Sequence, residues 1–115
     1  MSVIVRACGQ DADVQVVMLS GRLDLAASEA ATPGALAAVD SCKKGLIVDL
    51  GGVEFISSAG LRALLSVRKK AEAAGKKMGV IRARPAVYKI FKVSGLDAVF
   101  SFFEDEDEAL RGLWA

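Results

Sequence analysis

The sequence contains no histidine, and this absence narrows the chemistry that the chain can perform. Ser-His-Asp triads, Cys-His pairs and histidine metal sites are all excluded. The two cysteines, Cys8 and Cys42, lie far apart and lack metal-ligand spacing, so we expect free thiols in a reducing compartment. No acid–base pair stands out among the remaining residues. We therefore predict that the protein is not an enzyme and uses no metal or other cofactor.

Long apolar runs and a strong charge of either sign are also missing. No apolar stretch reaches the roughly 18 residues of a membrane span, and the start of the chain lacks a signal-peptide pattern. A formal net charge of +1 gives no reason to expect nucleic acid or an anionic membrane as a partner. Gly75-Lys76-Lys77 lacks the other residues of a P-loop, and no GxGxxG occurs. We expect a cytoplasmic protein that binds neither nucleic acid nor membrane.

What the chain does contain is typical of one globular α/β domain. Its 115 residues include 53% apolar and 25% charged side chains, enough for one core. Short apolar strands alternate with helical patterns, which favours strands joined by helical crossovers. We predict one domain over residues 1–115, with a mixed sheet of four to five strands, an N-terminal hairpin and about four helices.

Apolar periodicity and turn residues place the expected elements along the chain. Thr32-Pro33 is the predicted start of the first helix, because threonine caps well and proline suits the first helical position. Gly51-Gly52 is expected to break the central strand, and a short loop then returns Phe55 and Ile56 to the core. The expected strands lie at 3–5, 14–19, 46–48, 78–82 and 99–103, and the expected helices lie at 32–41, 58–74 and 85–95 and after an acidic start at 104–108.

The helix expected from Ser58 has one clear core face and one ambiguous face. The core face comprises Leu64, Val67, Ala71 and Ala74, which share one arc at 100° per residue. Leu61 and Leu65 lie on the adjacent arc together with Arg68. Two interpretations stay open: these leucines pack under a neighbouring helix, or they edge an exposed patch that a partner protein covers.

The pair Ser57-Ser58 connects the central strand to this helix. A serine at this place can cap the free N–H groups of the first helical turn. The same N–H groups and the helix dipole also favour a phosphate. The pair therefore has two interpretations, a plain helix cap and a phosphorylation site.

The stretch Phe55-Ile56-Ser57-Ser58-Ala59-Gly60-Leu61-Arg62, after a strand that ends in Val48-Asp49-Leu50, resembles the signature of the STAS domain family. It is especially similar to the bacterial anti-sigma factor antagonists, and the segments 21–25 and 95–96 extend the resemblance. Those proteins carry Asp-Ser-Ser-Gly-Leu or Asp-Ser-Thr-Gly-Leu and are phosphorylated on the hydroxyl just before the glycine. Here Ala59 takes that position and Ser57 takes the aspartate position. Ser58 is then the nearest hydroxyl, and Ser57 is the second.

This resemblance implies an anti-sigma factor antagonist. The unphosphorylated form would bind a GHKL-type ATPase that is both anti-sigma factor and serine kinase, and so free the sigma factor. A PP2C-type phosphatase would reverse the phosphorylation. The resemblance also places Asp24 beside the phosphorylated loop, whereas the residues alone fit a local Asx-type hydrogen bond equally well. An alternative within the family is a scaffold or ligand-binding subunit of a transport complex without phosphorylation. The implied partner surface comprises Asp24, Ser57, Ser58, Gly60, Leu61, Arg62, Leu65 and Arg68.

Overall fold

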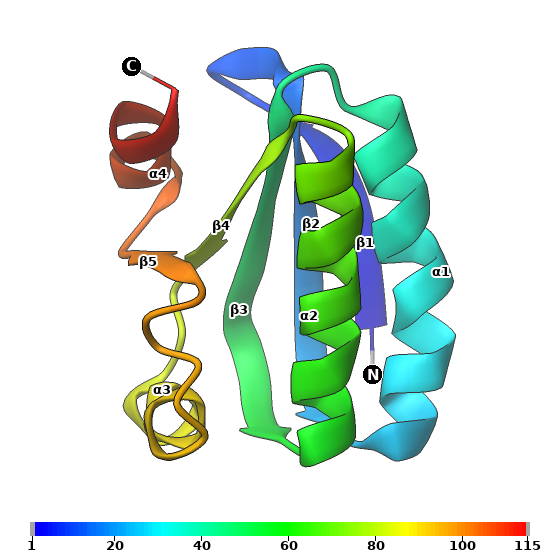
Figure 1. Ribbon diagram of the computed structural model, residues 1–115, viewed down its shortest axis with the longest axis vertical. Coiled ribbons are helices and arrows are strands. Elements are labelled where there is room, and N and C mark those ends of the chain that lie inside the picture. Colours follow the sequence, from blue (N-terminus) through cyan, green and yellow to red (C-terminus); the bar gives the residue numbers. More distant parts are fainter. Residues whose placement is uncertain (1, 115) are drawn as a thin grey trace.

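A computed structural model describes residues 2–114 and shows a single five-stranded sheet in the order β1-β2-β3-β4-β5 (Figure 1). β1 and β2 form an antiparallel hairpin, and the other neighbours are parallel. The predicted fold, a mixed sheet with an N-terminal hairpin and helices, is confirmed. The strands are β1 (Ser2–Cys8), β2 (Asp11–Leu23), β3 (Gly45–Ile56), β4 (Lys77–Ile81) and β5 (Ser101–Phe103). The helices are α1 (Leu25–Ser41), α2 (Ser58–Ala73), α3 (Pro85–Val93) and α4 (Glu106–Leu113).

The consecutive strand order explains why α1, α2 and α3 lie on one face of the sheet. Each of these helices connects a parallel strand to its next neighbour, and such crossovers are right-handed. Because the order never reverses, all three crossovers fall on the same side. Their apolar residues share one core with alternate strand residues such as Val17 and Leu19. Figure 1 shows α1 and α2 side by side in front of the strands.

The opposite face of the sheet is covered only in part, by α4. Ala109 is buried there against Ile47 and Ile81, and Leu110 and Trp114 pack around it. The acidic run starts this helix as predicted, since the Asp105 carboxylate accepts a 2.8 Å hydrogen bond from the Glu108 N–H. No helix within residues 2–114 is long and apolar enough to cross a membrane. Beyond α4 this face is partly open to solvent, since Ile4 of β1 is 53% exposed and Met18 of β2 and Gly51 of β3 are half-buried.

The start of α1 was predicted wrongly. The helix begins at Leu25, not at Thr32-Pro33, because Asp24 caps it by accepting a 3.0 Å hydrogen bond from the Ala27 N–H. Pro33 therefore lies inside the helix, at an exposed position. Burial of Ala31, Ala35 and Val39 against the sheet outweighs the helix-breaking tendency of one proline.

The end of β3 was also predicted wrongly. The strand continues through Gly51-Gly52 to Ile56, and its register with β2 shifts between Met18 and Ser20 and again between Gly21 and Arg22. A Cβ on Gly52 would lie 2.7 Å from the Ser20 Cβ, so the glycine permits a close approach of the strands rather than ending one. Ile56 is buried as predicted, but Phe55 is 37% exposed and lies under the Arg22 guanidinium at 4.4 Å.

Ala74, predicted to lie on the core face of α2, is exposed at the end of the helix. Val93 ends α3 in a similar way and is 71% exposed. A glycine with positive φ follows each helix end, Gly75 at 72° directly after Ala74 and Gly95 at 73° two residues after Val93. These glycines turn the chain away from the helix axis, so the last apolar residue of each helix leaves the core face.

Candidate functional site

Two helix N-termini meet at the carboxyl ends of β2 and β3. Leu23 and Ile56 are partners across these parallel strands, so the residues that follow them, Asp24 and Ser57, lie at the same edge of the sheet. Asp24 caps α1 and Ser57 caps α2. In Figure 1 both helices begin at the lower end of the sheet. Tertiary pairing thus brings together two predicted site residues that are distant in the sequence.

Ser57 has a structural role in this arrangement. Its hydroxyl accepts a 3.2 Å hydrogen bond from the Gly60 N–H and donates one of 3.1 Å to the Leu23 carbonyl oxygen. The Ser57 backbone N–H donates to the same carbonyl at 3.0 Å. The side chain is half-buried, so its hydrogen-bonding groups are committed to the cap and to β2. The plain-cap interpretation therefore describes Ser57.

Ser58 differs from its neighbour in exposure and in hydrogen bonding. It is the first residue of α2, its side chain is exposed, and its hydroxyl makes no hydrogen bond to any of the residues 2–114. The next residue, Ala59, is half-buried and carries no hydroxyl. Ser58 is thus the accessible hydroxyl of this loop.

Gly60 and Leu61 hold α2 against the strand ends. A Cβ on Gly60 would lie 2.7 Å from the Leu23 carbonyl oxygen and 2.8 Å from Ile56 Cγ1, so only glycine fits there. Leu61 is 5% exposed and belongs to the core, and Leu65 is half-buried against the same core. For Leu61, the packing interpretation holds in the free chain.

The two arginines of the predicted surface remain on the outside of α2. Arg62 is exposed, and the half-exposed Arg68 forms an ion pair with Glu72 one turn later. Asp24 is exposed beside the start of α1. The predicted site residues therefore divide into an outer set that a partner can touch and an inner pair, Gly60 and Leu61, that supports it.

A surface groove of about 570 Å³ lies between α1 and α2 next to Ser58. Leu25, at the start of α1, is 60% exposed on its edge. The sequence interpretation missed this side of the site because it began α1 at Thr32; recognising Asp24 as a cap would have placed Leu25 on the surface. The groove is lined by Leu25, Ser28, Glu29, Thr32, Pro33, Leu36, Ala59, Arg62 and Ala63.

The described part of the chain offers little for metal or thiol chemistry. Within residues 2–114 no three His, Cys, Asp or Glu side chains are grouped so that they could hold a metal ion. Cys8 and Cys42 are buried free thiols. Burial raises the pKa of the Cys42 thiol, which lowers its thiolate fraction at neutral pH. The groups exposed at the strand ends are the Ser58 hydroxyl, the Arg62 guanidinium, the carboxylates of Asp24 and Glu29, and apolar side chains such as Leu25.

These features define a small α/β domain with an exposed serine at the start of α2, next to a groove between α1 and α2. The family model of the STAS domain matches residues 9–109, and the chain belongs to that family.

Several proteins similar to this chain are described as anti-sigma factor antagonists. The anti-sigma-F factor antagonist RsfB of Mycobacterium tuberculosis is 29% identical over 100 residues, which cover 87% of this chain and 81% of RsfB. The crystal structure of an anti-sigma factor antagonist from Mycobacterium paratuberculosis has a TM-score of 0.85 at 28% identity, covering 99% of this chain and 94% of that one. The anti-sigma factor antagonist SpoIIAA in its unphosphorylated form has a TM-score of 0.77 at 21% identity, covering 96% of each chain. Phosphorylated SpoIIAA from Bacillus has a TM-score of 0.70, also at 21% identity, covering 96% of this chain and 98% of that one. At 21% identity the likeness shows the fold.

Proposed function

We propose that the protein is an anti-sigma factor antagonist that is switched by phosphorylation of Ser58. We assign the phosphate to Ser58 because the hydroxyls of Ser57 and Ser58 differ in exposure and hydrogen bonding. Ser57 is half-buried and hydrogen-bonded on both sides, whereas Ser58 is exposed with its hydroxyl free within the described chain. Support for the function comes from the relatives, which include anti-sigma factor antagonists, and from SpoIIAA, a protein of this fold known in a phosphorylated form.

The partner in this proposal is a cytoplasmic GHKL-type ATPase that is both anti-sigma factor and serine kinase. It binds the unphosphorylated protein and releases its sigma factor, and a PP2C-type phosphatase later removes the phosphate. The protein acts in this cycle as a binding partner and a kinase substrate, not as an enzyme. The docking surface comprises Asp24, Ser57, Ser58, Arg62, Leu65 and Arg68 together with the groove between α1 and α2, and Gly60 and Leu61 support it from below.

The position of Ser58 explains how one phosphate can block binding without unfolding the protein. A phosphoryl group adds about −1.5 to −2 charges near neutral pH. In the free protein this charge lies at the start of α2, where unpaired N–H groups and the helix dipole favour it. In the complex the same charge must lose water beside the apolar groove that Leu25 edges. Phosphorylation therefore lowers the affinity for the partner while the fold is retained.

Ser58→Asp tests the switch with purified components. The variant should fold normally and bind the cognate anti-sigma factor at least about tenfold more weakly, which corresponds to about 1.4 kcal/mol. Ser66→Asp is the matched control, because it adds the same charge at an exposed serine of the same helix, farther from the groove. Ser58→Ala should bind normally and escape regulation. Calorimetric titration gives the affinities, and circular dichroism verifies folding.

Peptide mapping after incubation with the cognate kinase and ATP tests the modified residue directly. The phosphate should appear on Ser58. Modification confined to Ser57 would refute the assignment of the serine but leave the antagonist function standing. A folded Ser58→Asp variant that binds as tightly as the unmodified protein would refute the switch. Absence of both binding and modification would favour the transport-complex alternative.

A further inference from the structure

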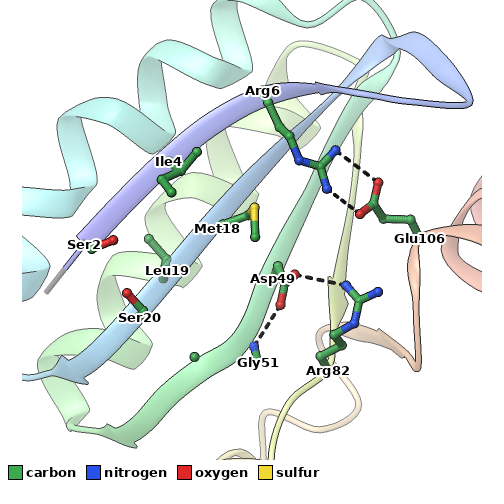
Figure 2. Close-up of a pocket in the computed structure, with 11 residues that line it drawn as sticks. Ser2, Ile4, Arg6, Met18, Leu19, Ser20, Asp49, Gly51, Arg82 and Glu106 are labelled. Carbon is green, nitrogen blue, oxygen red and sulfur yellow. Dashed lines mark hydrogen bonds and ion pairs between the residues drawn. The ribbon is translucent and has the colours of Figure 1, made fainter.

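The face of the sheet opposite α1 and α2 carries a groove of about 560 Å³ that the proposed switch does not use (Figure 2). We call it the open-face groove. It lies over β1, β2 and β3 and ends at Glu106, the first residue of α4. Its volume lies within the range of small-ligand pockets. Its lining residues are Ser2, Ile4, Arg6, Met18, Leu19, Ser20, Asp49, Gly51, Gly52, Arg82 and Glu106.

The groove is hollow because the central strand has no side chains at its middle. Gly51-Gly52 continue β3 without a Cβ, and a Cβ on Gly52 would meet Ser20 at 2.7 Å. Ile4 stands at the groove with 53% of its surface exposed, and Met18 is half-buried beside it. One part of the groove is therefore apolar and accessible to solvent.

Arg82 supplies the polar part of the groove from an unusual backbone position. It follows the end of β4 with φ of 55°, the left-handed region that side chains other than glycine rarely adopt. Non-glycine residues in this region are concentrated at functional sites. Figure 2 shows the Arg82 side chain reaching toward Asp49 of β3, and its Nη1 donates a 3.0 Å hydrogen bond to Asp49 Oδ2.

Asp49 fixes this guanidinium from one side. The Asp49 side chain is only 9% exposed, and its other carboxylate oxygen accepts a 2.8 Å hydrogen bond from the Gly51 N–H. The Arg82 side chain itself is 45% exposed. Its Nε and Nη2 donate to no residue in the described range 2–114. A positioned, always-charged guanidinium thus retains N–H donors for an acceptor from outside.

The second arginine of the groove is already paired. Arg6 Nη2 and Nη1 donate to Glu106 at 2.6 and 3.3 Å, and Nη1 also donates to the Ala7 carbonyl oxygen at 3.2 Å. The ion pair keeps the pKa of Glu106 below its usual value, so this carboxyl is charged at neutral pH. Both carboxylates of the groove therefore have a cationic partner. The unpaired groups that the two arginines leave at the groove are therefore hydrogen-bond donors, the Nε and Nη2 of Arg82.

From these contacts we propose that the open-face groove binds a small organic oxyanion, a carboxylate or phosphate monoester with a compact apolar body. Arg82 binds the oxyanion, since guanidinium donors match carboxylate and phosphate oxygens. The apolar body lies over Ile4, Met18 and the two glycines. The site is separate from the docking surface, because Arg82 and Asp49 lie on the face of the sheet away from α1 and α2.

The test is an NMR titration of the ¹⁵N-labelled protein with phenyl phosphate and with benzoate. Either anion should give saturable shifts at amides of the groove, including Gly51 and Gly52. Benzylammonium has a similar body with the opposite charge and should give none. Arg82→Gln should weaken binding about tenfold to hundredfold, as expected for the loss of a charge-assisted contact. Lys69→Gln is the matched control, because it removes the same charge from an exposed side chain of α2 outside the docking surface and should leave the affinity unchanged.

A second variant covers the case in which Arg82→Gln fails to fold because Asp49 loses its partner. Arg82→Lys keeps a cation near Asp49 but lacks the forked donors, so it should still fold and bind more weakly than the unmodified protein. The proposal is overturned if neither anion gives saturable shifts in the groove, if benzylammonium binds equally well, or if the folded Arg82 variants bind as tightly as the unmodified protein. It is also overturned if sedimentation shows a dimer and the amide shifts on dilution place its interface over Ile4.

Discussion

Alternate residues of β3 face opposite sides of the sheet and differ sharply in chemistry. Toward α1, α2 and α3 the strand presents Leu46, Val48 and Leu50, each at most 1% exposed. Toward the other side it presents Ile47, then Asp49 with its hydrogen bonds, then Gly51 at the open-face groove. The helix-covered face therefore gains stability from apolar burial. The open face relies on α4 and on ion pairs that water reaches.

One face of β3 therefore stabilises the fold, and the other face presents polar groups that a ligand can reach. On the helix-covered face the proposed docking surface lies at the edge of the sheet, where β2 and β3 end and α1 and α2 begin. On the open face the available site lies in the middle, where glycines replace side chains. The two proposed sites thus share a sheet but no surface. Four comparisons between substituted proteins test these differences, in order of expected effect.

The largest effect is expected in the core of the helix-covered face. Leu64→Ala should lower the free energy of unfolding by about 2–5 kcal/mol, because the side chain is 3% exposed and its loss leaves a cavity. Leu61→Ala should cost a similar amount, since Leu61 is 5% exposed. Ile4→Ala on the open face should stay within about 0.5 kcal/mol. Urea unfolding of the three variants gives these values, and an equal loss for Ile4→Ala would erase the contrast between the faces.

The next effect concerns the contact between α2 and the strand ends. Gly60→Ala should cost roughly 1–3 kcal/mol, because its Cβ would lie 2.7 Å from a backbone oxygen that cannot move freely. Gly9→Ala is the control, since no atom lies within 4 Å of a Cβ at that turn. Thermal unfolding followed by circular dichroism compares the two. Equal melting temperatures would show that α2 can shift away from Leu23.

A smaller effect distinguishes the two serines at the start of α2. Ser57→Ala should cost about 1 kcal/mol, because it removes the helix cap and the bond to Leu23. Ser58→Ala should stay within about 0.5 kcal/mol, since its hydroxyl is exposed. Denaturant midpoints measured under identical conditions test the difference. The reverse order would mean that Ser58 is the effective cap, and binding data on its variants would then need reinterpretation.

The smallest effect is expected at the ion pair of the open face. Glu106→Gln should cost about 1 kcal/mol or less at pH 7, because Arg6 is 40% exposed and water screens the pair. Arg6 lowers the pKa of Glu106 in the folded state. The contribution of the ion pair to the free energy of unfolding is therefore present in full above the unfolded pKa of about 4.3. It is lost as the pH falls through the folded pKa, so the stabilities of variant and unmodified protein should converge in acid.

Asp107→Asn serves as the control for that comparison. Asp107 lies in the same first turn of α4 and is exposed, so it shares the dipole contribution without the contact to Arg6. The difference in the free energy of unfolding between Asp107→Asn and the unmodified protein should vary less with pH. A pH-independent loss in Glu106→Gln, measured by urea unfolding from pH 7 downward, would contradict the ion-pair explanation.

Sequence reasoning predicted the fold and the neighbourhood of the site because those features have local signatures. In β2, for example, Val17 and Leu19 face one side and Val14 and Val16 the other, which is the period-two alternation that the sequence itself displays. The family signature directed attention to Ser57 and Ser58, but it left their roles open. Pattern alone could not separate two adjacent hydroxyls, because their difference depends on the Leu23 carbonyl, 34 residues away from Ser57.

The sequence by itself determined the order of the strands, most helix ends and the family. These features follow from the two periodicities of the backbone and from residue preferences within one turn. Only the tertiary structure decided that Pro33 lies inside a helix, that β3 continues through Gly51-Gly52, and that the caps Asp24 and Ser57 meet. Each of these depends on packing or pairing between segments distant in the chain, which outweighs the local preferences by burying more surface.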